Sequence, residues 1–210
     1  MSSKEFFDRV ARDWDEMREG YYSDDVRVSA LAAAVVEAGK VAADIGAGTG
    51  FITQGLIEEG LQVIAVDQSE VILDEMKTKF ARHPAIDYRV GNAEDLPIPG
   101  ETVDYVFANM CLHHVESPPD AIREMARILK PGGKLVITDA DEHAFEFLRE
   151  EHHDRWLGFK RTDIRTWFEA AGLGDVRVDD AGTCCEVQSF CCEDFARIGI
   201  FLASGEKPAA

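Results

Sequence analysis

The chain has 210 residues, of which 46% are hydrophobic, and this suits one globular domain with a sizeable core. Its 40 acidic and 22 basic residues give a net charge of −18, and no cluster of Lys or Arg offers a stripe for a phosphate backbone. Binding to nucleic acid is therefore not expected. Residues 1–5 lack the apolar core of a signal peptide, and the longest apolar run, residues 30–36, is too short to span a bilayer. We expect a cytoplasmic protein with no membrane partner; its oligomeric state stays open.

Two helices are predicted before the first strand. Apolar side chains recur at helical spacing on one face of the first: Phe6, Phe7, Val10, Ala11, Trp14 and Met17. Residues 26–36 form the second helix, which is rich in alanine.

A glycine-rich turn follows the first predicted strand, residues 41–45. Glycines let a backbone turn tightly and approach a ligand, and a helix beginning near Thr49 would direct its free N–H groups at that ligand. A dinucleotide fingerprint needs a third glycine at the position of Phe51, but the chain has it one residue earlier. A nicotinamide dehydrogenase is therefore disfavoured. The residues of the turn that we take as candidates are Asp44, Gly46, Ala47, Gly48 and Gly50.

The second predicted strand, residues 61–66, leads into Asp67, about 20 residues beyond the glycine turn, where a ribose-binding acid is expected. Its carboxylate can accept hydrogen bonds from both ribose hydroxyls. Ser69 is a suitable N-cap for the helix that follows, in which Ile72, Met76 and Phe80 share one face.

The remaining chain continues to alternate strands and helices. Further strands are predicted at residues 86–90, 103–108, 134–138, 176–178 and 198–202, and further helices around Ile122 and Met125 and at residues 145–157 and 162–171. Thr162 is the expected N-cap of the last helix and Gly172 its terminator. This alternation predicts a parallel sheet with helices on both faces.

The turn at residues 44–50 resembles motif I of the class I S-adenosylmethionine-dependent methyltransferases. The blocks at residues 91–97, 109–115 and 129–133 resemble the later motifs of that family in their usual order, so the resemblance covers roughly residues 5–175. The strings at residues 5–15 and 147–159 are similar to methyltransferase domains that bacteria fuse to metalloregulator-type winged helices. They are similar, less closely, to quinone and arsenite methyltransferases.

The resemblance implies an α/β fold: a doubly wound, mostly parallel, seven-stranded Rossmann-like sheet with an antiparallel last strand and N-terminal helices. We expect one domain over residues 1–210. Residues 1–38 would form an N-terminal helical lid, residues 39–140 the donor-binding core, and residues 141–210 the acceptor-side helices and terminal strands.

The family's cofactor is S-adenosyl-L-methionine, and the resemblance assigns its contacts residue by residue. The turn glycines would lie beneath the methionine and ribose, with Asp44 and the backbone carbonyl of Asn109 holding the ammonium. Asp67, with Gln68 beside it, would take the ribose. Asn92 and the Ala93 N–H would read the adenine edge. Ile72 would pack on the adenine ring. Many relatives carry an acid at the position of Asn92, and Glu94 is the neighbouring acid that could substitute for it.

The acceptor side is less defined, and a small molecule is the expected acceptor. His113 and His114 follow the fourth strand, where a general base could stand, although a packing or hydrogen-bonding role is favoured over catalysis. His152 and His153 could line the acceptor pocket or lie on a solvated helix. Tyr21 and Tyr22 could close over the donor or attach the first helix to the sheet.

The five cysteines suggest a minority alternative. Cys184-Cys185 and Cys191-Cys192 lack the spacing of a structural zinc site, and adjacent strand residues point to opposite faces. We therefore predict no metal site and interpret them as small buried hydrophobes of the last strands. Cys111 keeps open a metalloid methyltransferase that uses thiolates, and a non-catalytic S-adenosylmethionine-binding module is the third alternative.

Overall fold

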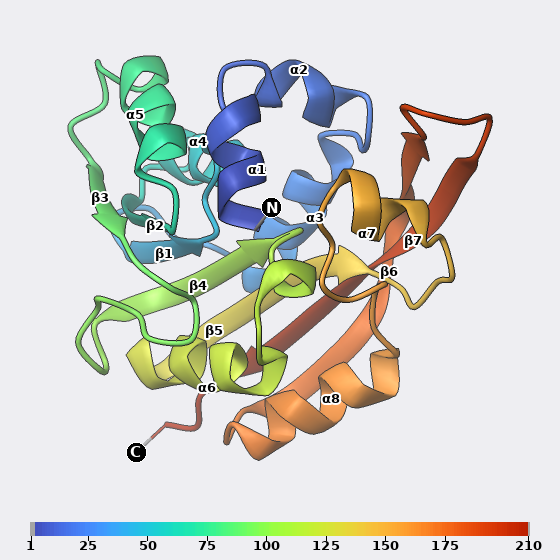
Figure 1. Cartoon of the computed structure of the whole chain (residues 1–210). Coiled ribbons are helices and arrows are strands. Elements are labelled where there is room, and N and C mark those ends of the chain that lie inside the picture. Colours follow the sequence, from blue (N-terminus) through green and yellow to red (C-terminus); the bar gives the residue numbers. More distant parts are fainter. Residues whose placement is uncertain (1–2, 210) are drawn as a thin grey trace.

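The computed structural model describes residues 3–209, and a seven-stranded sheet forms its centre (Figure 1). The strands follow the order β3-β2-β1-β4-β5-β7-β6. They are β1 (Val41–Ile45), β2 (Gln62–Asp67), β3 (Ile86–Val90), β4 (Val103–Asn109), β5 (Leu129–Ala140), β6 (Gly174–Gln188) and β7 (Phe195–Glu206). Strands β1 to β5 are parallel to one another, and β7 runs antiparallel to β5 and β6. The predicted sheet is confirmed.

Helices cover both faces of this sheet, as the alternating pattern requires. The order of the strands reverses between β1 and β4, which is the place where open α/β sheets bind ligands. The helices are α1 (Ser3–Val10), α2 (Trp14–Glu19), α3 (Asp25–Ala34), α4 (Phe51–Glu58), α5 (Glu70–Lys79), α6 (Pro118–Ile128), α7 (Phe147–Glu151) and α8 (Arg161–Ala170), with a short 3₁₀ turn η1 (Leu112–His114). No helix among residues 3–209 combines the length and the apolar content needed to cross a membrane.

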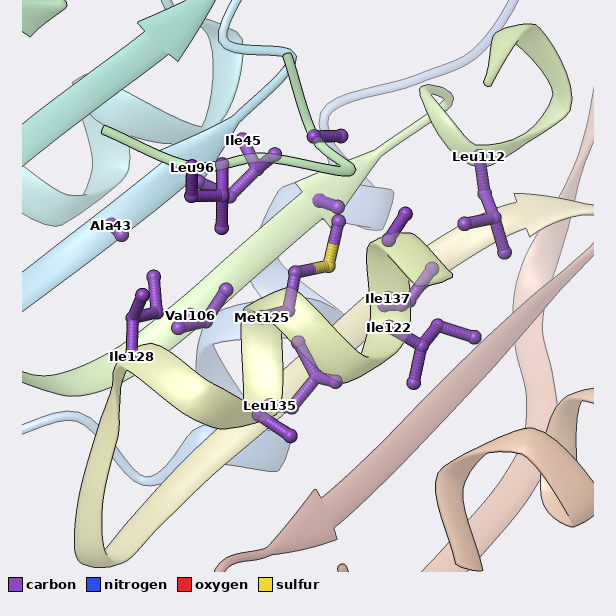
Figure 2. Packing of buried hydrophobic residues seen from close by; sticks show 14 of the residues in the cluster. Ala43, Ile45, Leu96, Val106, Leu112, Ile122, Met125, Ile128, Leu135 and Ile137 are labelled. Carbon is purple, nitrogen blue, oxygen red and sulfur yellow. The ribbon is translucent and has the colours of Figure 1, made fainter. Parts of the chain in front are cut away.

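The larger core lies between the sheet and α6 with α8. Val106 and Ile137 of the central strands are fully buried against Ile122 and Met125 of α6 (Figure 2). Each such side chain contributes about 1.5–3 kcal/mol by leaving water. Alternate residues of the same strands, such as Phe107, face the opposite layer formed by α3 and α4. Both layers fix the carboxyl ends of β1, β2 and β4, where the site lies.

The first predicted helix is two helices, which is a correction. The chain leaves the helix after Val10 and re-enters it at Trp14. The break brings the Phe7 and Trp14 rings together edge to face, with centroids 5.0 Å apart. The packing of these two rings, and not the helical spacing of the sequence, therefore determines the local structure.

The segment after β5 also differs from the prediction. Helix α7 stops at Glu151, because the Glu151 carboxylate accepts hydrogen bonds from the Ser189 hydroxyl and the Phe190 N–H, and His153 takes a left-handed backbone conformation. The last helix begins at Arg161 with Lys160 as N-cap, not Thr162, and the Arg161 guanidinium pairs with Asp141.

The strands around β5 to β7 are longer than predicted. Strand β5 already begins at Leu129, and β6 and β7 form a long hairpin. Cys184 and Cys185 lie in β6, and Cys185 is buried as expected. Cys191 and Cys192 are exposed in the turn of the hairpin, so the interpretation of this pair as buried strand residues is wrong.

Candidate active site

The glycine turn after β1 builds the floor of the site. Gly46, Gly48 and Gly50 all have positive φ angles, which L side chains rarely adopt. A Cβ on Gly46 would overlap the Cys111 side chain, and one on Gly50 would overlap the Phe80 ring. The turn therefore needs glycine for its conformation and for the space that its neighbours occupy.

Asp67 faces this turn from the end of β2. Its carboxylate accepts hydrogen bonds from the Gly48 N–H (3.0 Å) and the Ser69 N–H (2.9 Å). Burial raises the pKa of Asp67, while these N–H groups oppose the shift. The Ser69 hydroxyl accepts from the Ile72 N–H at 3.1 Å, so the predicted N-cap of α5 is confirmed.

A cavity of about 290 Å³ lies over the turn. Ten of the sequence-predicted donor residues line it: Gly46, Ala47, Gly48, Asp67, Gln68, Ile72, Asn92, Ala93, Glu94 and Asn109. Asp44 and Gly50 do not line it. The Asp44 carboxylate is buried beneath the turn and accepts from the Thr53 N–H (3.0 Å) and hydroxyl (2.6 Å). Burial raises the pKa of Asp44 to about 6.

The N-terminal helices supply the roof of the cavity. A helical lid was expected from the sequence, but the residues that make its contacts were not. Phe7, Trp14 and Arg18 line it. Asp15 holds α2 in place, since it accepts from the Thr49 hydroxyl (2.5 Å) and pairs with Lys79 (2.7 Å). The helical spacing predicted the shared face of Phe7 and Trp14, but nothing in it indicated that this face covers a ligand cavity.

Arg18 is the one cation of α2 that is buried at this cavity. Its guanidinium carbon lies 4.4 Å from the centroid of the Phe51 ring, and its nearest carboxylate, Asp24, is 4.0 Å away. The Nε atom is buried with no hydrogen-bond partner in the described part of the chain. A buried guanidinium with an unpaired Nε at a cavity wall is suited to an anionic ligand group.

A second cavity of about 60 Å³ adjoins the first. Both cavities share five wall residues: Phe7, Trp14, Tyr22, Met110 and His114. Tyr21, His113 and His152 line only the second cavity, whereas His153 lines neither. Tyr22 thus lies at the junction of the two cavities, and Tyr21 lies beyond it, in the second cavity.

The two histidines of η1 have different environments. The His113 Nδ1 lies 2.7 Å from Asp139 Oδ1, and its Nε2 lies 3.8 Å from Asp154 Oδ1. Burial opposes a charge on His113, yet the two carboxylates raise its pKa to about 9. Burial and the neighbouring His113 instead lower the pKa of His114, which is neutral.

His152 is buried, so the alternative of a solvated helix does not apply to it. It follows α7, packs on the Tyr21 and Phe190 rings, and burial lowers its pKa to about 4. Cys111 lines the donor cavity, and burial raises the pKa of its thiol, so the thiolate that a soft metalloid needs is disfavoured.

Comparison with known proteins agrees with this geometry. Residues 43–137 match the methyltransferase domain family. The chain is 32% identical to the 2-methyl-6-phytyl-1,4-hydroquinone methyltransferase 1 of Oryza sativa over 167 residues, 78% of this chain and 50% of that one. It is 26% identical to the ubiquinone biosynthesis O-methyltransferase of Coxiella burnetii over 185 residues, 80% and 79% of the two chains. The chain spans between 27% and 50% of the length of the first curated relatives that it matches.

The fold has solved counterparts. A chain from the complex between the Haloferax volcanii Trm112 methyltransferase activator and a methyltransferase superposes with a TM-score of 0.79 at 22% identity, covering 96% of this chain and 97% of that one. The family match and these relatives support a class I S-adenosylmethionine-dependent methyltransferase. The same match supports S-adenosylmethionine as its cofactor.

Proposed function

We propose that this protein transfers the methyl group of S-adenosylmethionine to a small hydroxylated aromatic molecule. The observation that carries the proposal is the pair of adjoining cavities, a larger one over the glycine turn and a smaller one beyond it, which share an aromatic wall. A methyl transfer needs two such compartments, because donor and acceptor must meet in line with water excluded.

The donor occupies the larger cavity. Asp67 accepts from the ribose hydroxyls, and the Arg18 guanidinium, which lies at the wall and has an unpaired Nε, binds the carboxylate of the methionine part. Asn92 and Ile72 take the adenine. Glu94 is less free for that task, because its carboxylate accepts from the Ser117 N–H. Asp44 acts indirectly by holding the turn through Thr53.

The acceptor occupies the smaller cavity. Its walls are largely aromatic and include Phe6, Tyr21 and Trp156, which suits a flat ring. The quinone and hydroquinone relatives named above support the same class of acceptor. A net charge of −18 speaks against nucleic acid, and five unpaired cysteines suit a reducing compartment such as the cytoplasm.

The reaction itself is a direct displacement. A lone pair on the acceptor oxygen forms a bond to the methyl carbon while the carbon–sulfur bond breaks, and its electron pair stays on sulfur. The donor becomes a neutral thioether, and the proton of the acceptor hydroxyl passes to solvent. The chain's contribution is to align the two groups and to keep the acceptor ionised.

Two measurements test the proposal. Calorimetry is expected to give micromolar binding of S-adenosylmethionine and its demethylated product, with NAD bound far more weakly. A product assay over phenols, quinols, amines and arsenite is then expected to show turnover with the hydroxylated aromatics. Preference for NAD overturns the donor assignment. Donor binding with no turnover on any acceptor favours a non-catalytic module.

The donor assignment has a sharper test in Asp67→Ala. A hydrogen bond to a charged group is worth about 1.5–3 kcal/mol, so the variant is expected to lose roughly tenfold or more in donor affinity. Glu70→Ala, which changes an exposed acid three residues further on, serves as the matched control. Equal affinities for the two variants would show that Asp67 is misassigned.

A further inference from the structure

We propose that the smaller cavity holds a divalent transition-metal ion on His113, His114 and Asp154. One ligand atom from each of these residues lies within 4.8 Å of the ligand atoms of the other two. Ligands bound to one ion at about 2.0–2.2 Å lie about 3.4 Å apart, so small side-chain rotations complete the site. Two imidazoles and one carboxylate are a set that Zn²⁺ and similar ions use, with a further position left open.

His113 is already oriented as a metal ligand. Asp139 Oδ1 holds its Nδ1 at 2.7 Å, which leaves Nε2 directed to Asp154. Asp139 is itself fixed, because Oδ1 accepts from the Ala140 N–H (2.7 Å) and Oδ2 from the Leu112 N–H (2.8 Å). A carboxylate behind the distal nitrogen is the usual support of a metal-binding histidine.

The backbone positions Asp154 just as firmly. The N–H groups of Arg155 and Trp156 both donate to the His113 carbonyl at 3.0 Å, and the Trp156 indole N–H donates to the Val115 carbonyl at 3.0 Å. These bonds attach the loop after α7 to η1. The three proposed ligands therefore come from two segments, 40 residues apart, that are hydrogen-bonded together.

His114 has a lone pair to offer. Its Nδ1 is buried and has no hydrogen-bond partner among residues 3–209. A buried polar atom without a partner is costly, and a bound ion satisfies it. The charge also fits, since the buried Asp139 and the part-buried Asp154 both face the cluster. Neither carboxylate forms an ion pair with a Lys or Arg of the described chain.

The open position would face the acceptor. His114 lines both cavities, so an ion beside it lies where the donor methyl and the acceptor oxygen meet. The ion would bind that oxygen and favour its ionised form, which is the nucleophile. This role rests on the proposed methyl transfer, whereas ion binding does not.

Metal binding is measured directly on the full chain after chelator treatment. Co²⁺ is titrated by visible absorption and Zn²⁺ by calorimetry. We expect one ion per chain and weakening by at least about tenfold in Asp154→Asn and in His113→Gln. His143→Gln is the matched control: His143 lines the same cavity outside the cluster and is expected to leave ion affinity within about twofold of the parent.

Several outcomes would overturn the assignment. They are no stoichiometric ion, an affinity that Asp154→Asn leaves unchanged, or thiolate-to-cobalt charge-transfer bands that place the ion on the exposed cysteines. Asp154→Asn keeps the test open should His113→Gln not fold. Donor binding is followed in parallel, so the two proposals separate. Full turnover by ion-free protein refutes the ion's role in the transfer alone, and a bound ion without turnover refutes the methyl transfer alone.

Discussion

Asp44 and Asp67 reach different environments although each closes a parallel strand beside the same turn. Asp67 meets backbone N–H groups at a cavity wall, whereas Asp44 lies under the turn and is only 1% exposed. Two hydrogen bonds from Thr53 do not offset the loss of water around the Asp44 carboxylate, so its pKa stays near 6. Asp44, which the motif marks most clearly, therefore has mainly a structural role.

Asp44 makes the stability of the fold depend on pH. Its folded-state pKa lies above the unfolded value of 3.8, so its contribution is favourable below about pH 4 and is lost as the pH rises through about 6. Asp44→Asn is therefore expected to raise the free energy of unfolding at pH 8 by up to about 3 kcal/mol for two pKa units, and with it Tm, and to change both little at pH 4. Thermal unfolding at both pH values checks this, and an equal effect at the two values would contradict it.

The elements show how far the sequence predicts the structure. The parallel strands and the cap of α5 follow from local patterns, whereas the donor-side residues were assigned from the resemblance to the methyltransferase motifs. The division of α1 from α2, the short α7 and the hairpin turn were missed, because contacts between distant segments determine them. Arg18 and Asp154 were missed for the same reason. Arg18 lies one helical turn beyond Trp14, which was the only available signal.

The attachment of α2 gives a prediction for the N-terminal helices. Asp15→Ala removes the contacts to Thr49 and Lys79, and because the carboxylate is partly exposed we expect a cost of about 1 kcal/mol. Donor Kd should rise about fivefold, with faster hydrogen exchange in residues 3–19 only. Asp13→Ala is the control, since that neighbouring acid caps no helix through its side chain. Unchanged exchange in Asp15→Ala would show that α2 is held by other contacts.

The β6–β7 hairpin contains one buried cysteine and, in its turn, two exposed cysteines. Cys185→Ala should lower Tm because the side chain is buried. Cys191→Ser and Cys192→Ser lie in the exposed turn, so each should leave the free energy of unfolding within about 0.5 kcal/mol of the parent value. Arsenite should not raise the Tm of the parent chain, because the thiols that line cavities are buried and protonated. Tight arsenite binding lost on changing Cys111 together with either pair would reverse this view and restore the metalloid acceptor.

At the scale of the whole molecule, charge is the most unusual property. Most of the 40 acidic side chains repel one another across the surface, while the ion pairs of the described chain are largely partly exposed and contribute little. The site itself is mixed, since Arg18 lies at the donor cavity and Asp154 at the smaller one. Self-repulsion should therefore act on the global stability and not on the local geometry of the cavities.

Salt is expected to stabilise the protein for this reason. Raising the ionic strength from about 10 mM to about 150 mM shortens the Debye length from about 30 Å to about 8 Å, which screens repulsion between surface carboxylates. Each 1 kcal/mol of repulsion relieved raises Tm by about 2–4 °C in a domain of this size. The control is the same pair of measurements near the pI of about 4.6, where the net charge approaches zero and the increase should vanish. An equal increase at both pH values would mean that salt acts through general exclusion from the surface, and that the acidic excess is not what limits stability.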